Sequence, residues 1–482
     1  MTHIHFIGIG GTGLSAIARV LLERGVTVTG SDIHESPQIG LLRNAGAYIT
    51  IGHAAGNVSG ADIVVRSSAI PDSNIEVQAA GGTGVPVQKR RDFLVWLLEN
   101  NQVIAVAGTH GKTTTTAMIA WMLTALGMDP SYIVGSPLIN LDSNAHAGQD
   151  ALFVIEADEY DHMFLGLYPH LAVITNVEHD HPDCFPTPKS FAQAFLEFIG
   201  QVEPGGSVLA CFDDPGVLAL LEEDVVERVK VIGYGIAPHT HGLSPDYVAR
   251  NLYVNELGGY TFDVYRVQEE TIEAARIAQV SLRVAGEHNV RNALAAIAAA
   301  ELLGLSPEQA AEALRAFKGT SRRFEVLGEA EGVTVIDDYA HHPTEIRATL
   351  SAARARYPGR SIWAVWQPHT YSRTRLLFDE FANSFTDADH VLVTEIYPAR
   401  ESRPADGFSA SEVVEAMHHP SKYYALDFDQ ALQILLTQLS PGDILLVLSA
   451  GDANQLGRLV LNTFHNRKHQ PDMAGVNMNG RS

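Results

Sequence analysis

The sequence predicts an α/β protein of about three domains, and three observations lead to this prediction. Its 482 residues are too many for one hydrophobic core, because a single domain usually has about 100–200 residues. Apolar residues make up 46% of the chain, which is enough for several cores. Finally, a pattern of apolar strand, turn and helix begins three times, near residues 3, 102 and 333.

The first segment, residues 1–98, predicts a βαβ unit. "HIHFIGIG" has the pattern of a strand with a glycine-rich turn, "LSAIARVLLERG" that of a helix, and "VTVTGSD" that of a second strand. The turn, residues 8–13, fits the dinucleotide fingerprint G-x-G-x-x-G, and Asp32 ends the second strand, where a ribose-binding acid is expected. This pattern indicates a pyrophosphate near a helix N-terminus without naming NAD, FAD or a nucleotide sugar.

The second segment, residues 99–320, begins with a phosphate-binding pattern, "AVAGTHGKTTTT". Only Thr109 and His110 separate Gly108 from Gly111, so the loop is shorter than the G-x-x-x-x-G-K-[ST] pattern. Backbone N–H groups of residues 108–113 can still surround phosphate oxygens, and Lys112 can reach a nucleotide triphosphate. Antiparallel hairpins over residues 245–285 and a helix from about residue 289 complete this segment.

Acidic residues and histidines follow the next two apolar strands of this segment. "EADEYD" (156–161) places four acids after one strand, and Mg²⁺ at a nucleotide needs one or two carboxylates. "NVEHDHPD" (176–183) follows the next, but His179 and His181 have no further ligands at a zinc spacing, so zinc is not expected. Asn289 and Asn292 lie on one face near a helix start, and their spacing favours capping over adenine binding.

The third segment, residues 321–465, again has polar groups after apolar strands. "DDYAHHPTEI" (337–346) and "QPHTYSRTR" (367–375) combine acid, imidazole and guanidinium groups, which suit a zwitterion or a transferring phosphoryl group. Residues 466–482 are polar without periodicity, and we expect a disordered tail there.

Composition excludes several classes of protein. The formal charge of −23 argues against nucleic acid or anionic membrane as a partner, because both need a basic surface. Two cysteines exclude a disulfide framework and suit a reducing compartment. The N-terminus lacks the pattern of a secretory signal, and no apolar run is long enough to span a membrane. We therefore expect a cytoplasmic protein.

Taken together, these motifs resemble the Mur ligase family over residues 1 to about 465. The resemblance depends on "GIGGTGLSAIA", "GTHGKTTTT", "EADEYD", "TNVEHDH", "GEHNVRNALAA", "RRF", "DDYAHHPTEI" and "QPHTYSRT", in the order of the family. It implies a Rossmann-like UDP-sugar domain, a central P-loop ATPase-type domain and a C-terminal Rossmann-like domain. The most similar members join L-alanine to UDP-N-acetylmuramate, using ATP and Mg²⁺, in peptidoglycan precursor synthesis. A monomer or homodimer is expected.

The resemblance also implies roles for individual residues. The residues implied in UDP-sugar binding are Gly8, Gly10, Gly11, Thr12, Gly13, Asp32, Ser67 and Ser68. Those implied in ATP binding are Gly108, Thr109, His110, Gly111, Lys112, Thr113, Thr114, Asn289, Asn292 and Arg323, which replaces the capping interpretation of the two asparagines. The implied metal ligands are Thr113, Glu156 and His181, and the implied catalytic residues are Lys112, His181, Asp338, His342 and Arg373.

The implied reaction passes through an acyl phosphate, which the amine of L-alanine then attacks; a closing C-terminal domain would exclude water. Either Asp338 or His342 is expected to help deprotonate the ammonium group. Two features depart from the family. Thr370 stands where members often carry arginine, which leaves Arg373 for the alanine carboxylate, and Lys189 has no motif that assigns it the carbamylated-lysine role of sibling ligases.

Three other functions are considered. A family member that joins a preformed tripeptide to the same UDP-sugar is the nearest alternative, and "QPHTYSRT" favours the alanine reaction over it. An NAD-dependent oxidoreductase would leave Lys112 and the metal acids without a role. A non-catalytic scaffold would require the acceptor machinery to be lost, whereas Lys112, Glu156, His181 and Arg373 are all present.

Overall fold

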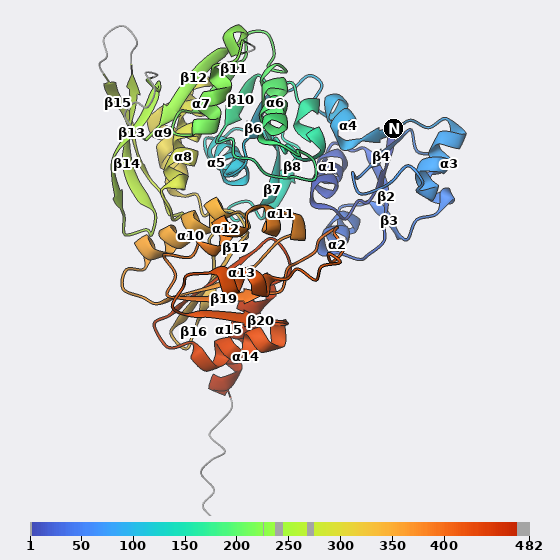
Figure 1. The fold of residues 1–482 in the computed structure, drawn as a ribbon. Coiled ribbons are helices and arrows are strands. Elements are labelled where there is room, and N and C mark those ends of the chain that lie inside the picture. The colour runs from blue at the N-terminus through green and yellow to red at the C-terminus, as the bar shows by residue number, and fades with distance from the viewer. Residues whose placement is uncertain (1, 225, 237–243, 268–273, 470–482) are drawn as a thin grey trace, which may run out of the picture. The chain divides into compact units, whose positions relative to one another are not determined.

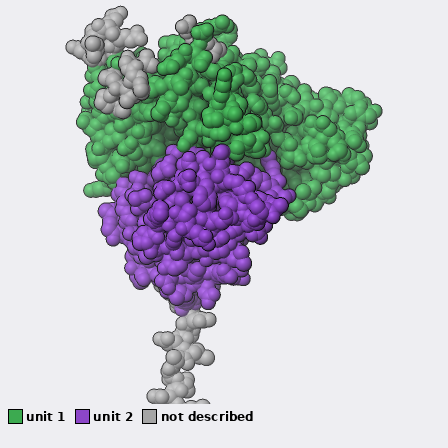
Figure 2. Space-filling model, in the orientation of Figure 1, with its two compact units in different colours: residues 1–321 green, residues 322–482 purple. Residues whose placement is uncertain are grey.

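The protein has a three-domain α/β architecture built on three separate β-sheets, as expected (Figure 1). This computed structural model describes residues 2–224, 226–236, 244–267 and 274–469. The chain divides into two compact units, residues 1–321 and 322–482 (Figure 2). The first unit contains two of the sheets and the second unit contains one.

The N-terminal sheet has five parallel strands in the order β3-β2-β1-β4-β5. Its strands are β1 (His3–Ile7), β2 (Thr27–Asp32), β3 (Tyr48–Ile51), β4 (Ile63–Arg66) and β5 (Val87–Lys89). Its helices are α1 (Thr12–Glu23), η1 (Ala55–Val58), α2 (Pro37–Asn44), α3 (Ile75–Thr83) and α4 (Arg90–Leu97). Its central strand β1 is apolar and buried over Ile4, Phe6 and Ile7, as expected for a strand covered on both faces.

A buried carboxylate, that of Glu76 in α3, ties this sheet to the helix above it. It accepts hydrogen bonds from Ser31 Oγ at 2.6 Å and from Asn57 Nδ2 at 2.6 Å, and it lies 3.3 Å from His5 Nε2. Although burial opposes ionisation, these hydrogen bonds and one from the Ala54 N–H lower the pKa of Glu76 to about 2. Glu76 is therefore ionised inside the fold because its partners replace water.

The central sheet has ten strands, parallel in the middle and antiparallel at both edges, in the order β15-β14-β13-β12-β11-β10-β6-β9-β7-β8. Its strands are β6 (Gln102–Ala107), β7 (Ser131–Leu138), β8 (Ser143–His146), β9 (Leu152–Glu156), β10 (Leu171–Ile174), β11 (Ser207–Cys211), β12 (Lys230–Gly235), β13 (Tyr247–Val254), β14 (Tyr260–Val267) and β15 (Ala274–Ser281). The hairpins expected over residues 245–285 are thus present. The helices are α5 (Lys112–Ala125), η2 (Tyr160–Gly166), α6 (Pro188–Ile199), α7 (Pro215–Leu221), η3 (Val226–Arg228), α8 (His288–Leu302) and α9 (Pro307–Arg315).

The second unit contains a six-stranded sheet in the order β16-β17-β21-β18-β19-β20, with only the β16–β17 pair antiparallel. Its strands are β16 (Glu325–Ala330), β17 (Val333–Asp338), β18 (Ile362–Gln367), β19 (His390–Thr394), β20 (Lys422–Ala425) and β21 (Ile444–Ser449). Its helices are α10 (Pro343–Arg356), α11 (Tyr371–Leu376), α12 (Phe378–Ala382), α13 (Ala410–Ala416), α14 (Phe428–Gln438) and α15 (Asn454–His469).

The last helix, α15, corrects one expectation about the C-terminal tail. It continues to His469, so residues 466–469 are helical rather than part of a tail beginning at residue 466. Leu456, Val460 and Phe464 of this helix are buried in the core of the sheet, and the helical hydrogen bonds extend about one turn beyond this anchored part. Residues 470–482 lie outside the described part of the chain.

Within the described residues, the helices are all too short or too polar to span a bilayer.

We predict that Glu76→Gln destabilises the N-terminal sheet at neutral pH and much less in acid. The folded-state pKa of about 2 lies below the ordinary value of 4.5, so the ionised carboxylate stabilises the fold above about pH 4.5 and loses this effect as pH falls toward 2. At about 1.4 kcal/mol per pKa unit, the contribution amounts to roughly 3 kcal/mol. Hydrogen exchange of the β1 and β2 amides measures the stability of this sheet by itself. A local measurement is needed because the chain has more than one cooperative unit.

Glu99→Gln is the matched control, because the Glu99 side chain is exposed. Its amide exchange is expected to equal that of the unmodified protein at both pH values. A Glu76→Gln effect of equal size at about pH 7 and about pH 3 would contradict the assigned cause.

Candidate functional site

The short glycine loop of residues 108–111 lies where three parallel strands of the central sheet end. It follows β6, which pairs with β9 on one side and with β10 on the other. Because the carboxyl ends of parallel strands meet at one sheet edge, the segments after β9 and β10 border this loop. The loop then leads directly into α5, which begins at Lys112.

Two glycines allow the neighbouring segments to approach this loop closely. Gly108 has φ +138°, and a Cβ there would lie 2.0 Å from Thr175 Oγ1. Gly111 has φ +80°, and a Cβ there would lie 2.8 Å from Asn292 Oδ1. Both positions therefore require glycine, for backbone conformation and for space.

The backbone donors of the loop divide into two groups. The Thr109 N–H donates to the Asn176 carbonyl at 3.1 Å, and the His110 N–H donates to Asn176 Oδ1 at 2.8 Å. These two N–H groups bind the loop to the segment after β10. They are therefore not part of the phosphate cradle expected for residues 108–113. The first-turn amides of α5, which include those of Lys112 and Thr113, have no intrahelical acceptor, as is typical of a helix N-terminus that can bind an anion.

Lys112 is held by an ion pair with Glu159. Its Nζ lies 2.9 Å from Glu159 Oε2 and also donates to the Gly108 and Thr109 carbonyls. The Lys112 and Glu159 side chains are only 12% and 1% exposed. Burial alone would lower the pKa of Lys112, but the carboxylates of Glu159, Asp158 and Glu156 raise it, so the group stays charged.

Thr113 and Glu156 provide two adjacent oxygen donors beside Lys112. Thr113 Oγ1 donates to Glu156 Oε1 at 3.0 Å, and the Gly135 N–H donates to Glu156 Oε2 at 2.6 Å. Burial raises the pKa of Glu156, although Lys112 opposes this shift. A hydroxyl and a carboxylate this close are hard oxygen ligands of the type that Mg²⁺ prefers.

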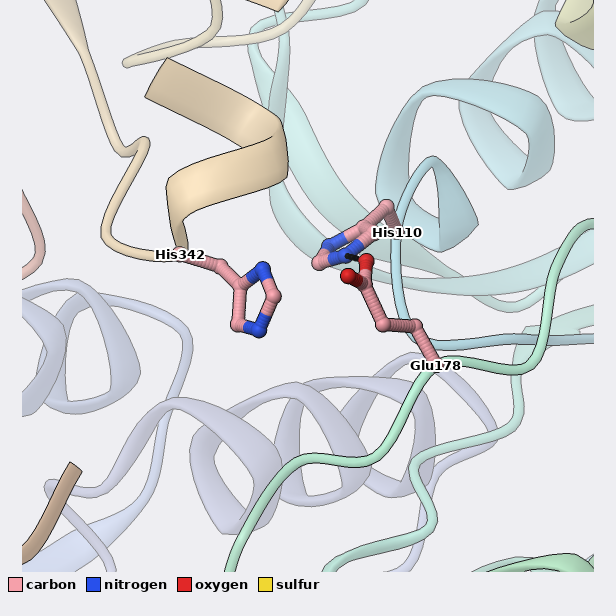
Figure 3. A group of neighbouring side chains, drawn as sticks. All are labelled: His110, Glu178 and His342. Atoms are coloured by element: carbon pink, nitrogen blue, oxygen red, sulfur yellow. Dashed lines mark hydrogen bonds and ion pairs between the residues drawn. The ribbon is translucent and has the colours of Figure 1, made fainter. Parts of the chain in front are cut away.

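The histidines around the loop have separate partners. His110 Nε2 lies 2.8 Å from Glu178 Oε2, and the two side chains face each other in Figure 3. His181 Nε2 lies 3.5 Å from Glu159 Oε1, whereas His179 Nε2 contacts the Phe185 carbonyl at 2.8 Å. His181 thus lies beside the carboxylate that binds Lys112, and His179 faces elsewhere.

The N-terminal glycine loop, residues 8–13, adjoins Asp32 and Ser67, whereas Ser68 contacts Asp161 of the central domain. The Gly10 N–H donates to Asp32 Oδ2 at 2.9 Å. A Cβ on Gly8 would lie 3.1 Å from Ser67 Cβ, and Ser68 Oγ donates to Asp161 Oδ2 at 2.6 Å. Thr12 begins α1, so the helix N-terminus expected at this loop is present.

Asn289 and Asn292 do not cap α8. The N-cap residue is Glu287, and its side chain makes no capping hydrogen bond. Both asparagines lie within the first turns and are buried; Asn289 Nδ2 donates to the Ala285 carbonyl at 2.7 Å, and Asn292 Nδ2 donates to Asn289 Oδ1 at 2.9 Å. The capping interpretation is therefore wrong, because the helix begins earlier than the spacing indicated.

In the second unit, predicted residues from just before β16 and from the ends of β17 and β18 form a cluster. Arg323 lies 5.1 Å from the Tyr339 ring centroid, Tyr339 contacts the His341 ring, and His341 contacts the His369 ring. Arg373 Nη1 lies 3.0 Å from His369 Nδ1 and completes the cluster. Both linking histidines, His341 and His369, lie in the two polar motifs of this segment, but neither was given a specific role there.

Asp338 and His342 lie beside this cluster in the same unit. Asp338 accepts hydrogen bonds from the Phe324 and Ala340 N–H groups, each at 2.7 Å. Burial raises the pKa of Asp338 to about 6, although Arg323 and these hydrogen bonds oppose the shift. The His342 side chain caps α10, where its Nδ1 accepts from the Thr344 N–H at 3.3 Å.

Two residues with direct contacts to the site groups were missed by the sequence reasoning. Glu159 was one of four acids after β9 and was not separated from the others, although it is the one that binds Lys112. Arg90 donates to Asp158 Oδ2 at 2.8 Å and was not considered. The signal for Arg90 was a pair of arginines directly after a predicted strand in a strongly acidic chain.

Three domain families match the chain in succession. Residues 3–102 match "Mur ligase family, catalytic domain", residues 106–300 match "Mur ligase middle domain", and residues 322–451 match "Mur ligase, glutamate ligase domain". The first glycine loop therefore lies in a ligase domain and not in that of an oxidoreductase.

Curated relatives match over almost the whole chain. The UDP-N-acetylmuramate–L-alanine ligase of Roseiflexus sp. (strain RS-1) is 42% identical over 96% of this chain and 99% of the relative. That of Nitratidesulfovibrio vulgaris (strain DP4) is 43% identical over 94% and 97%. Among solved structures, UDP-N-acetylmuramate-alanine ligase MurC from Thermotoga maritima has a TM-score of 0.79 at 28% identity and covers 97% of this chain and 100% of its own.

A murein peptide ligase, Mpl, from Psychrobacter arcticus 273-4 has the same identity, 28%, but a lower TM-score of 0.69, and covers 97% of this chain and 99% of its own.

We predict that Gly108→Ala weakens binding of a fluorescent ATP analogue by about tenfold or more, equivalent to about 1.4 kcal/mol. The added Cβ would collide with Thr175 Oγ1 and would lie 3.0 Å from the Asn176 carbonyl oxygen, so the loop must move. The control is Gly127→Ala, because Gly127 also has positive φ (+85°) but open space around it. That variant should lose about 1–2 kcal/mol of folding stability and keep its nucleotide affinity. Equal affinities of the two variants would contradict the steric explanation.

Proposed function

The chain belongs to the Mur ligase family, and we propose that it is an ATP-dependent ligase that joins L-alanine to the lactyl carboxylate of UDP-N-acetylmuramate. The observation that carries the proposal is the 42% identity to a ligase of this name over 96% of this chain. The product is a precursor of peptidoglycan. ATP and nucleotide sugars are found in the cytoplasm, and we place the reaction there.

The three sheets have separate roles in this proposal. The N-terminal sheet, within residues 1–98, binds the UDP diphosphate at residues 8–13 with Asp32, Ser67 and Ser68. The central sheet, within residues 99–320, binds ATP at the loop of residues 108–111 and the start of α5. The third sheet, from residue 321 to about residue 465, binds the amino acid.

Lys112 supports the first chemical step by its charge. The lactyl carboxylate oxygen attacks the γ-phosphorus of ATP, the bond to the β–γ bridging oxygen breaks, and ADP leaves. Two anions must approach each other in this step, and the ammonium group of Lys112 offsets their repulsion. Glu159 keeps this ammonium group beside the loop, at an Nζ–Oε2 distance of 2.9 Å.

The donors beside Lys112 fit Mg²⁺. Thr113 and Glu156 would hold one ion, because their hydroxyl and carboxylate oxygens already lie 3.0 Å apart, and His181 would be a ligand of a second ion. When bound, the ion neutralises phosphate charge and acts as a Lewis acid on the γ-phosphoryl group.

The second step forms the amide. The amine of L-alanine attacks the carbonyl carbon of the acyl phosphate, phosphate leaves from the tetrahedral intermediate, and the amine loses a proton. Arg373 binds the alanine carboxylate, and Asp338 or His342 takes up the proton. A carboxyl group with a pKa near 6 is suited to proton transfer near neutral pH. Asn289, Asn292 and Arg323 complete the ATP site.

We predict that release of phosphate from ATP requires both UDP-N-acetylmuramate and L-alanine. Purified protein is assayed with each candidate acceptor (L-alanine, glycine, L-serine and the murein tripeptide), and the product is identified by mass spectrometry. Release with the tripeptide alone would contradict the proposed substrate and support the peptide ligase instead. The oligomeric state, monomer or homodimer, is measured on the same sample.

Lys112→Ala is expected to lower the rate of this release by about a hundredfold or more, because a preorganised charge at the γ-phosphate is lost. Lys230→Ala is the control, since Lys230 is exposed at the start of β12, and its activity should be unchanged. Phosphate release at an unchanged rate in Lys112→Ala would contradict the mechanism.

A further inference from the structure

We propose that Arg90 is a positioning residue that couples binding of the nucleotide sugar at residues 8–13 to binding of ATP at residues 108–111. This inference rests on the proposed function and adds a residue to which no role has been assigned above. It depends on three groups of contacts within the first unit.

The Arg90 guanidinium lies between the N-terminal glycine loop and Asp158. Arg90 begins α4, directly after β5, and its side chain is 21% exposed. A Cβ on Gly13 would lie 2.1 Å from Arg90 Nη1, so the absence of a side chain at Gly13 makes room for the guanidinium. Gly13 is in the first turn of α1, where the helix dipole favours anions. A cation here is positioned to bind a diphosphate.

The other end of the guanidinium binds Asp158. Arg90 Nη2 donates to Asp158 Oδ2 at 2.8 Å. Since a guanidinium has five N–H donors in a planar fork, Arg90 can hold Asp158 through Nη2 and still donate to a phosphate through Nη1. A lysine could not do both with the same geometry.

The segment that carries Asp158 divides its acids between the two loops. Glu156 accepts from Thr113, and Glu159 pairs with Lys112, so both act at the ATP loop. Asp158 pairs with Arg90, and Asp161 accepts from Ser68 at 2.6 Å, so both act at the N-terminal domain. Residues 156–161 therefore form one continuous connection between the two sites.

Part of this segment has a strained backbone that depends on those contacts. Asp161 has φ +54° and His162 has φ +53°, in the left-handed region. Such residues cost about 1–3 kcal/mol each and persist only where their surroundings hold them. The hydrogen bond from Ser68 and the Lys89–Asp161 ion pair, at 3.8 Å, supply part of that support from the N-terminal domain.

The expected coupling is positive. A diphosphate bound to Arg90 fixes the guanidinium from both sides, which fixes Asp158 and the neighbouring Glu156 and Glu159. ATP then binds to loop partners that are already ordered, so it loses less conformational entropy on binding. By thermodynamic linkage, ATP must strengthen sugar binding by the same factor.

Isothermal titration calorimetry tests this coupling on the full-length protein. The Kd of a non-hydrolysable ATP analogue with Mg²⁺ is measured with and without saturating UDP-N-acetylmuramate. We expect the sugar to tighten analogue binding by about fivefold or more. In Asp158→Asn the factor should fall below about twofold. Because Asp158 also acts on Lys112 through charge, the Kd of the analogue alone is measured for this variant too, and the factor is taken as the ratio of the two Kd values of the same variant.

Arg90 variants separate a positioning role from a merely structural one. Arg90→Met should lose the coupling factor and also weaken sugar binding, and Arg90→Lys should recover sugar binding more than coupling. Arg91→Met is the matched control, because the adjacent Arg91 is exposed, and its coupling factor should equal that of the unmodified protein. Far-ultraviolet circular dichroism establishes whether each variant is folded. If Arg90→Met does not fold, Asp158→Asn provides the test of the coupling.

A coupling factor near one in the unmodified protein, or an unchanged factor in Asp158→Asn and Arg90→Met, would overturn the inference. A failure of the proposed function would give a different result. In that case the unmodified protein would neither bind UDP-N-acetylmuramate nor form product from it with L-alanine and ATP. Normal product formation with an unchanged coupling factor in the variants would refute only the role of Arg90.

Discussion

The site of the first unit depends on one buried ammonium group, that of Lys112, surrounded by carboxylates. Glu159 lies 2.9 Å from it, and the carboxylates of Asp158 and Glu156 also stabilise its charge. Removing one partner of a buried ion pair leaves the other charge uncompensated, which is strongly unfavourable. The arrangement therefore keeps the lysine charged at the glycine loop, directly at the start of α5.

Space at this loop is the second constraint, and it explains why the loop can be short. Gly108 lets Thr175 approach at the end of β10, and Gly111 lets Asn292 approach from α8. Asn176 binds the Thr109 and His110 N–H groups and thereby replaces the longer loop of the usual pattern. In the proposed function, the first-turn amides of α5 therefore supply the donors that the two missing loop residues would have supplied.

The sequence predicted the three α/β domains, the hairpins of the central sheet and the neighbourhood of Lys112, Thr113 and Glu156, because strand patterns locate the sheet edge where these groups meet. Glu159 could not be chosen from four acids in six residues, because it follows the end of β9, where no strand or helix period indicates which side chain faces Lys112. Arg90 meets Asp158 across 68 residues of chain, and no local pattern reports such a pairing. The spacing of Asn289 and Asn292 alone favoured capping, an interpretation that the resemblance replaced, because helix boundaries are uncertain by about two to four residues from sequence.

The central claim is that the carboxylate of the sugar substrate, and not water, attacks the γ-phosphate of ATP. Transfer of isotopic oxygen tests it most directly. UDP-N-acetylmuramate labelled with ¹⁸O in the lactyl carboxylate is converted with L-alanine and ATP, and the released phosphate is examined by mass spectrometry. An acyl-phosphate mechanism transfers one labelled oxygen atom to each phosphate, because the bond that breaks in the second step is the bond from the acyl carbon to that oxygen. Unlabelled phosphate alongside normal amide formation would contradict the account.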